Sequence, residues 1–223
     1  FRQVITDYYG EGSPAYNLLG TANTNWQDEI LRTSVSSDYN LSVGGTYKIL
    51  PYRVAVSYTN QNGILKTSAM DRVTASITLN PKFFDNTLSV TANVKGFYMH
   101  NRFADEGAIG GAVSFDPSQS VRVDNLPIGN GYFTWLKPGT DEFIGIAPVN
   151  PVSLIDERSM KADVYRSVGN LQLDYVMPFL PALHANLNLG YDVSHSIQHN
   201  LMTPDSPLTY KENKKTGLGQ DER

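Results

Sequence analysis

Aromatic and charged side chains are concentrated in one long, irregular stretch of the chain, residues 99–163. The faces of aromatic rings stack well against sugar rings, and neighbouring charged groups can hydrogen-bond hydroxyls or the charged ends of a peptide. Irregular segments longer than about 15 residues are usually functional or disordered. We therefore expect this loop to contact a ligand. The candidate residues are Arg102, Asp105, Phe115, Asp116, Tyr132 and Trp135.

A second explanation for the same aromatic residues is packing. An ordered loop of this length needs a small core of its own. Phe133 and Phe143 lie in the same stretch and have the right size to help build one. Both explanations remain open from the sequence alone.

Patterns typical of catalysis or metal binding are weak. His195 and His199 have the spacing of helical metal ligands, but they follow a strand and lack a third ligand, so we expect solvated loop histidines. The glycine-rich segment 107–111 lacks the Lys-Ser/Thr ending of a phosphate loop. The adjacent acids at 141–142 and 156–157 are candidates for glycoside hydrolysis, but such pairs are commonly just exposed charge. We expect no catalytic residue, no metal site, no cofactor and no enzyme.

Composition excludes several classes of protein. The net charge is -4, with 18 basic and 22 acidic residues, so we expect no broad basic face and no nucleic-acid partner. The chain has no cysteine, which excludes disulfides and thiolate metal sites. No run of about 18 apolar residues occurs, which excludes a transmembrane helix. The mean hydropathy of -0.31 fits a soluble domain and a membrane barrel equally well, because a barrel is apolar on one face only.

Six segments around the loop alternate apolar and polar residues with period two, which predicts strands whose two faces meet different surroundings. The segments are 35–43, 52–59, 72–79, 88–98, 165–175 and 183–193. The alternation is weakest at Ser167 and Gly169. No charged residue falls on the six apolar faces. The opposite faces carry Asp38, Arg53, Arg72, Lys95, Arg166, Asp174 and Asp192.

A charge-free face fits contact with lipid, since Lys or Arg facing lipid at mid-membrane costs roughly 2 to 4 kcal/mol. A soluble sandwich core excludes charge in the same way. Strand length favours the membrane, because several segments keep their register for about 10 residues, whereas globular strands usually run about 5 to 6. Tyrosines at 165 and 175 bracket a band of about 25 Å, as two aromatic girdles do. We assign Tyr52 to one girdle, and Tyr58, Tyr98 and Tyr191 to the other.

Loop lengths alternate along the chain. The connections 45–51, 80–87 and 176–182 are short, whereas 60–69 is longer and 99–163 very long. Membrane barrels have short periplasmic turns and long outer loops, which places the long loop, the segment before Ser34 and the segment after Ser194 outside the cell. If a periplasmic plug led directly into the strand at Val35, the direction would invert, and the sequence leaves this open.

Six strands cannot close a membrane barrel, since the smallest barrels have about 8 strands and open edges in lipid leave backbone groups unpaired. Residues 210–223 read as a polar loop. We therefore expect an all-β fold: an antiparallel transmembrane β-barrel wall segment of about six strands, with a long extracellular loop. The remaining strands must come from elsewhere.

Four stretches carry a resemblance to a known family: 22–33 (ANTNWQDEILRT), 58–67 (YTNQNGILKT), 79–84 (LNPKFF) and 108–117 (AIGGAVSFDP). Through them the chain resembles the early barrel portion of the SusC-like (SusC/RagA) family of TonB-linked transporters of the bacterial outer membrane. The resemblance implies a plugged barrel of about 22 strands that imports oligosaccharides or peptides. It also implies a SusD-like surface lipoprotein as a lid, and TonB engaged through a missing N-terminal part. Residues 1–223 are then a partial β-barrel domain without the plug, and the loop residues become candidates for lid contact too.

The main rival hypothesis is a soluble carbohydrate-binding β-domain, with a hydrolase third. A soluble β-domain would bury the same apolar faces between two sheets and bind glycan through exposed aromatic rings. The rivals differ in one visible property, which is whether a second layer of protein covers the apolar faces.

Overall fold

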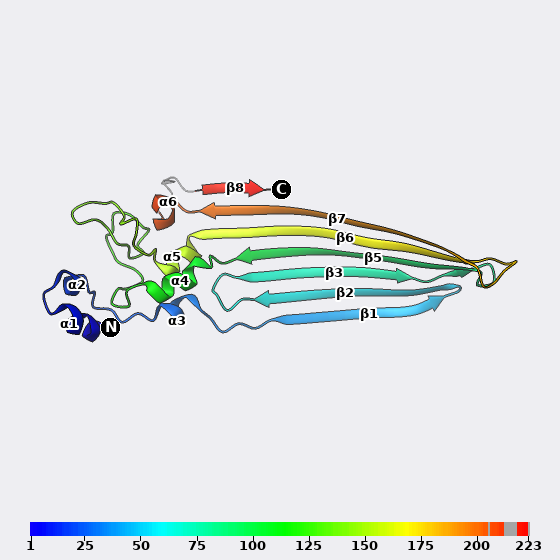
Figure 1. Ribbon diagram of the computed structural model, residues 1–223, viewed down its shortest axis with the longest axis horizontal. Helices are drawn as coiled ribbons and strands as arrows, with labels where there is room; N and C mark the ends of the chain where they lie inside the picture. The colour runs from blue at the N-terminus through cyan, green and yellow to red at the C-terminus, as the bar shows by residue number, and fades with distance from the viewer. Residues whose placement is uncertain (205, 212–217, 223) are drawn as a thin grey trace.

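A computed structural model describes residues 1–204, 206–211 and 218–222. Their centre is one antiparallel sheet in the order β1-β2-β3-β5-β6-β7-β8, with β4 paired to β5 (Figure 1). The strands are β1 (Ser37–Tyr47), β2 (Leu50–Asn62), β3 (Ala69–Leu79), β4 (Lys82–Phe83), β5 (Leu88–Phe103), β6 (Arg158–Val176), β7 (His184–Met202) and β8 (Leu218–Glu222). The helices are α1 (Arg2–Tyr9), α2 (Pro14–Asn17), α3 (Trp26–Ile30), α4 (Gly107–Ser114), α5 (Pro151–Asp156) and α6 (Pro207–Lys211). Within the described ranges no helix has the length and apolarity needed to cross a membrane.

All six predicted strands are present, and each extends beyond its predicted range, three of them by five residues or more at one end. β5 continues to Phe103, β6 begins at Arg158 and β7 continues to Met202. The irregular loop is therefore 104–157 instead of 99–163. The alternation ends early in the sequence because the outward side of these strand ends is polar, whereas the ladder of backbone hydrogen bonds continues. His195 and His199 consequently lie on β7 and not in a loop, which corrects the prediction for them.

Two short strands were not predicted. β8 pairs with the end of β7, from Gln198 to Met202, inside the stretch that we expected to be a polar loop. That prediction is wrong for Leu218–Glu222, whereas 212–217 and 223 lie outside the described residues. Pairing along a strand edge needs backbone groups only, so a polar sequence can form it. β4 lies in the connection after β3 and pairs two residues with β5.

The register brings the six apolar faces onto one side of the sheet. Tyr39, Tyr58, Val73, Tyr98 and Tyr165 are successive cross-strand partners and form one row from β1 to β6. Side chains on this side are open to the surroundings: the exposed fraction is 71% for Leu41 and 53% for Leu189. No second layer of the described chain covers them. An open apolar side is what a lipid-facing wall requires, and a sandwich core would have hidden it.

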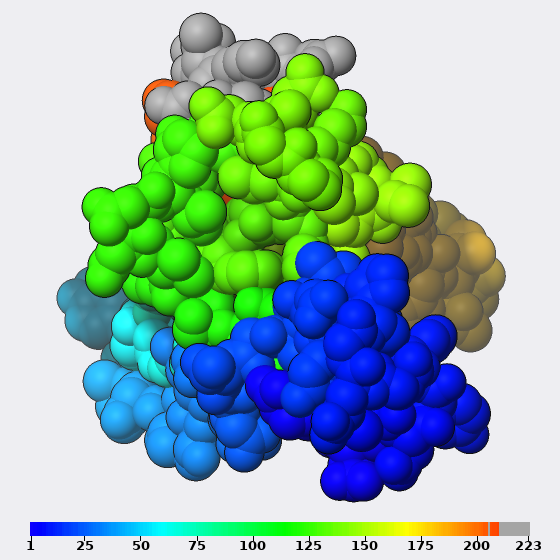
Figure 2. Space-filling model, turned by 90° about the vertical axis from the view of Figure 1, so that its left-hand side faces the viewer, coloured from blue at the N-terminus to red at the C-terminus, as the bar shows by residue number. Residues whose placement is uncertain are grey.

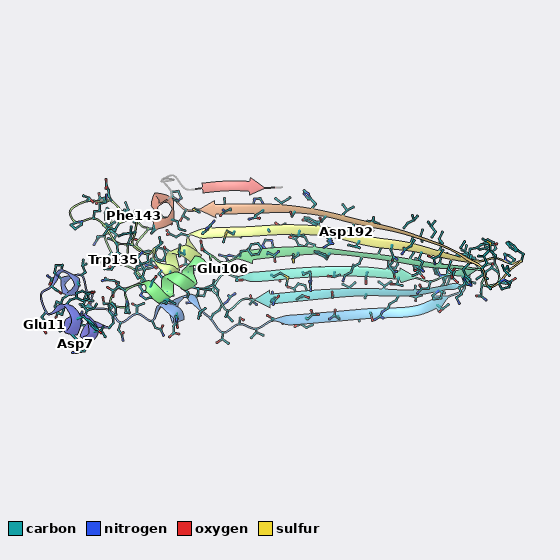
Figure 3. All side chains as sticks on the ribbon, in the orientation of Figure 1. Asp7, Glu11, Glu106, Trp135, Phe143 and Asp192 are labelled. Atoms are coloured by element: carbon teal, nitrogen blue, oxygen red, sulfur yellow. The ribbon has the colours of Figure 1, made fainter. Side chains whose placement is uncertain are left out.

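The opposite side of the sheet is polar and charged, as predicted. Asp192 on β7, labelled in Figure 3, forms an ion pair with Arg166 on β6, whose Nε donates to Asp192 Oδ1 at 2.8 Å. His184 Nδ1 lies 3.1 Å from Asp174 Oδ1 further along the same two strands. Arg53 and Lys95 lie on the same side and line a shallow recess with the side chains of Ser42, Ser57 and Thr74.

Tyrosines at 39, 58, 98 and 165 form one girdle, near the end of the sheet that the 104–157 loop joins. The rings of Tyr39 and Tyr58 stack with centroids 6.5 Å apart, and those of Tyr98 and Tyr165 lie 4.9 Å apart. Tyr191 is not part of this row, which corrects its assignment. It is the partner of Gly169, two rows deeper in the apolar band, where its ring covers the space that the glycine leaves.

The connections between strands lie alternately at the two ends of the sheet. The turns 48–49, 80–87 and 177–183 lie at one end. The connection 63–68, the 104–157 loop and helices α1 to α6 all lie at the other end, which we call the helical end (Figure 1). The predicted long loop therefore lies at the same end as the segment before Ser34, but the predicted alternation of lengths is wrong for 63–68, which with six residues is shorter than 80–87 and 177–183.

Candidate functional site

The helical end is a small body with its own core, built from segments that are distant in sequence. Its buried members are Trp26, Ile30, Leu65, Ala104, Ala108, Ala112, Phe115, Leu154, Ile155, Met202 and Leu208. They come from α3, from the turn before β3, from the 104–157 loop, and from the chain around the end of β7. Burial of this apolar area is what orders the loop, because a loop of this length has no ladder of strand hydrogen bonds to hold it.

Local capping fixes α5, one of the two helices in the loop. Asn150 is buried and its Oδ1 accepts the backbone N–H of Val152 at 3.0 Å, while Pro151 occupies the first helical position of α5. The Asn150 Nδ2 donates to the carbonyl of Val121 at 2.9 Å. One side chain thus caps α5 and ties it to the middle of the loop.

Four aromatic rings form a continuous chain from the core to the surface of the helical end. Trp26 meets Phe115 with centroids 4.6 Å apart, Phe115 meets Phe133 at 6.1 Å, and Phe133 meets Trp135 at 5.0 Å. All three contacts are edge-to-face, which is a favoured geometry for aromatic pairs. Phe115 is 3% exposed and therefore cannot stack on a ligand, whereas Trp135 is only partly buried.

Trp135 separates two hollows. On one side is a groove of about 580 Å³ between the N-terminal segment and α4, whose walls include Phe1, Leu18, Gln27 and Val113. On the other side is a small apolar pocket that Trp135 shares with Phe143, and Figure 3 shows both side chains at the helical end. Figure 2 looks onto this end, where the N-terminal segment (blue) lies against the loop (green). This groove beside Trp135 is the candidate site.

The N-terminal wall of the groove is attached to the loop by backbone contacts. The N–H of Thr24 donates to the carbonyl of Pro117 at 2.8 Å, and that of Ala22 donates to the carbonyl of Ser118 at 3.0 Å. Sequence reasoning missed this wall, because α1 and α2 are too short for a helical periodicity to be clear. The available signal was Ser13–Pro14, since Ser13 Oγ caps α2 by accepting from the N–H of Tyr16 at 3.2 Å.

Tyr132 is 4% exposed and lies inside the body instead of in the groove. Its hydroxyl donates to Asp156 Oδ2 at 2.8 Å, and the guanidinium of Arg122 lies 4.1 Å from the centre of its ring. Burial, followed by the hydrogen bond to Asp156, raises the pKa of the Tyr132 hydroxyl well above its ordinary value. The ring and its hydroxyl therefore link two parts of the loop.

The two candidate aspartates also bind within the body. Asp105 Oδ2 accepts from Arg158 at 2.9 Å, and its Oδ1 accepts from the N–H of Gly107 at the start of α4. Asp116 Oδ1 accepts from the N–H of Ser118 at 2.8 Å, and its backbone carbonyl accepts from Trp26 Nε1 at 3.0 Å. Of the six candidate residues, Phe115, Asp116 and Trp135 line the groove, although the ring of Phe115 is almost fully buried. Arg102 lies on β5, outside the loop.

The adjacent acids do not face one another across a cleft. Glu142 pairs with Lys137 at 2.7 Å, and Asp156 is bound by Tyr132. Glu157 is 6% exposed and accepts from Asn130 at 2.6 Å and from Ser206 at 2.9 Å. Burial raises the pKa of the Glu157 carboxyl, against the lowering effect of these hydrogen bonds. Among the described residues no group of three or more acidic or histidine side chains is placed to hold a metal ion.

The chain is similar in sequence to a curated receptor and in fold to solved structures of a peptide importer. No family model matches the chain. It is 37% identical over 217 residues to the TonB-dependent receptor SusC of Bacteroides thetaiotaomicron, an alignment that covers 92% of this chain and 21% of that receptor. The chain thus spans about a fifth of the length of this curated relative.

Among solved structures, the chain is similar to the RagAB peptide importer in its closed-closed state, with a TM-score of 0.65, 16% identity, and coverage of 90% of this chain and 23% of that chain. The open-open state gives a TM-score of 0.64 at 16% identity, with coverage of 91% and 23%. At this level of identity the two structures share the fold of the sheet and its loops with this chain, and nothing about a ligand follows from them.

Proposed function

Because the chain belongs to the SusC-like family of TonB-dependent receptors, we propose that its parent protein imports oligosaccharides and that residues 1–223 form part of the barrel wall. The family is found in the bacterial outer membrane, and the resemblance read from the sequence is confirmed. The observation that carries the proposal is the 37% identity along a sheet with one open apolar side and one charged side. Peptides are the alternative class of substrate.

The other parts of the importer would come from the remainder of the parent protein. The relative is about five times longer than this chain, since the alignment covers 21% of it. We assign to that remainder the strands that close the barrel at the free edge of β1, the plug domain, and the segment that engages TonB. Closure is required because an open sheet edge in lipid leaves backbone groups without partners.

The helical end is the proposed outer surface, where a SusD-like lipoprotein would act as the lid. Long loops face outward in barrels of this class, and the 104–157 loop, which is far longer than the connections 80–87 and 177–183 at the other end, lies here. Apolar side chains are exposed here, among them Val4, Ile109 and Val113. The groove beside Trp135 opens among them, which makes it the proposed contact for ligand or lid.

The rival functions have less support. A soluble carbohydrate-binding domain would cover the valines, leucines and tyrosines of the apolar side with a second layer, and these side chains are open. A hydrolase would need two carboxylates facing a substrate, whereas Asp156 and Glu157 hydrogen-bond to different parts of the body.

Deletion of the parent gene tests the proposal. We expect the native host to lose growth on one class of oligosaccharide supplied as sole carbon source, and the parent protein to require detergent for extraction from the outer-membrane fraction. Loss of growth on a peptide mixture alone would move the substrate to the peptide class. Unchanged growth on both panels, or recovery of the parent without detergent, would overturn the proposal.

Trp135→Ala in the parent tests the groove, with Tyr8→Ala as the matched control, because Tyr8 is an exposed aromatic residue at the same end and lies outside the groove. Uptake is expected to fall several-fold in the Trp135 variant and to be retained in the control. Equal uptake by both variants would remove the groove from the proposal.

A further inference from the structure

Two basic side chains are directly opposed on neighbouring strands: Arg102 on β5 is the cross-strand partner of Lys161 on β6. Lys161 is in turn the partner of His199 on β7, so three basic residue types form one row across three strands. Like charges that are directly opposed across a strand pair destabilise the sheet. An anion that bridges Arg102 and Lys161 would remove this repulsion.

This row belongs to the outward side of the sheet. Arg102 lies four residues after Tyr98, and Lys161 four residues before Tyr165, so the alternation of strand side chains puts all four on one side. The small body at the helical end covers the other side, where Ala162 and Met202 are buried. Lys161 is exposed, and Arg102 is partly exposed. The row is therefore open to whatever surrounds the barrel.

Beyond His199 the row continues with Asp221 on β8, whereas the acids nearer to Arg102 and Lys161 are already bound. In the row between the basic residues and the tyrosines, Asp163 accepts from the Tyr98 hydroxyl at 2.6 Å and pairs with His100 at 2.8 Å. Asp71 accepts from the Tyr58 hydroxyl and from Asn60, each at 2.8 Å. Arg102 and Lys161 make no ion pair with any residue in the part of the chain that is described. Both charges are available for an external anion.

The backbone of the row lies a few ångströms beyond the lipid headgroups, within reach of its long side chains. Four residues at about 3.3 Å per residue, tilted by about 40°, place the row roughly 10 Å beyond the tyrosine girdle along the membrane normal. The polar region of a bilayer extends about 5 to 7 Å beyond the hydrocarbon on each side. Arg and Lys side chains can lean several ångströms toward the membrane to bring their charges to that level.

We propose that Arg102 and Lys161 together bind a phosphate of the phosphorylated glycolipid, lipid A, in the outer leaflet. A phosphate offers several oxygens, so it can accept from the planar guanidinium of Arg102 and from the ammonium of Lys161 at once. The choice of leaflet rests on the proposed orientation, in which the helical end faces outward. This assignment gives Arg102 a partner outside the barrel, instead of a ligand in the loop.

Lipid binding by the purified, delipidated parent protein tests the assignment. The variant is R102Q/K161Q, and the matched control is R53Q/K95Q, which removes one arginine and one lysine from the opposite side of the same sheet. Bisphosphorylated lipid A is titrated onto each protein, and the bound lipid is counted by native mass spectrometry. Resistance of the folded band to cold SDS shows that each variant has folded.

Lipid A is expected to bind R102Q/K161Q at least about tenfold more weakly than the unchanged parent and the control, since each lost hydrogen bond between charged groups removes a factor of roughly ten. Lipid A without phosphates should bind the unchanged parent and R102Q/K161Q alike. Equal binding of bisphosphorylated lipid A by the unchanged parent and R102Q/K161Q would overturn the proposal. If phosphatidylglycerol displaced bisphosphorylated lipid A as effectively as lipid A itself does, the assignment of lipid A as the bound lipid would be wrong. The outcome is independent of import, so a parent that imports no oligosaccharide should still show the tenfold difference.

Discussion

Trp26 and Phe115 pack edge to face with ring centroids 4.6 Å apart, although Trp26 precedes the whole sheet and Phe115 lies in the loop between β5 and β6. Trp26 is 2% exposed, and its Nε1 also donates to the backbone carbonyl of Asp116 at 3.0 Å. This contact makes the N-terminal segment and the 104–157 loop one packing unit. The groove beside Trp135 exists only while the two remain together.

Trp26→Ala in the parent protein should therefore loosen the helical end without unfolding the sheet. Removing a buried tryptophan typically costs about 3 to 5 kcal/mol. We expect limited proteolysis in detergent micelles to cut within 104–157 at least several-fold faster, while the barrel stays resistant to cold SDS. Tyr8→Ala, which removes an exposed ring at the same end, is the control. Equal cleavage of the two variants would show that the contact does not hold the loop.

The strands of the sheet could be predicted because successive side chains lie on opposite sides of it, one apolar and one polar, so every second residue has the same character. Val56 and Tyr58 alternate with Ser57 and Thr59 within the span in which β2 pairs with both of its neighbours. The extensions of β6 and β7 could not, because the apolar and polar sides are exchanged beyond the tyrosine row. On β6 the outward side carries Lys161 and Asp163, whereas Ala162 on the other side is buried. Helices of four to eight residues are likewise too short to show a helical period.

The role of each loop aromatic could not be predicted from its type. Stacking on a sugar and packing in a core use the same flat apolar face, so Phe115 and Trp135 look equivalent in the sequence. The structure separates them by position: Phe115 lies in the middle of the aromatic chain and Trp135 at its outer end. Likewise, Arg102 looked like part of the loop until the length of β5 placed it on the sheet.

A charge on the apolar side of β2 should disrupt the folding of the parent in a bilayer, and the same charge one residue away should not. Val56 faces the apolar side and Ser57 the polar side. Val56→Arg is expected to make folding into phospholipid bilayers less favourable, by less than the roughly 2 to 4 kcal/mol of a mid-membrane arginine, because Val56 lies one row inside the tyrosine girdle. Ser57→Arg, the control, should change the free energy of folding much less, because its side chain meets water or polar groups. Similar losses for both would contradict lipid contact on that side.

The contact between Tyr191 and Gly169 predicts that the stability of the wall depends strongly on the size of the side chain at position 169. A methyl group at Gly169 would overlap the Tyr191 ring and lie 3.0 Å from the carbonyl oxygen of Asn93. Gly169→Ala should therefore destabilise the wall by about 1 to 3 kcal/mol, as overpacking does. Gly190→Ala is the matched control, because its added carbon would lie 3.6 Å from the nearest atom, an ordinary contact. The measurement is the temperature at which the parent loses its compact band in SDS, and an unchanged value for Gly169→Ala would contradict this packing.

The buried carboxyl of Glu157 predicts that the stability of the helical end, but not that of the sheet, depends on pH. Burial raises the pKa of this carboxyl in the folded body, so the folded state binds its proton more tightly than the unfolded state, whose glutamates titrate near about 4.3. Its contribution to stability is fully present below that value and is lost as the pH rises through the raised pKa. We expect proteolysis within 104–157 to accelerate over this range in the parent protein. Glu157→Gln, which carries no titrating proton, should make the rate of proteolysis depend less on pH over this range. Glu106→Gln, which changes an exposed residue, should leave the pH dependence unchanged. A profile for Glu157→Gln as steep as that of the unchanged protein would show that other groups control the effect.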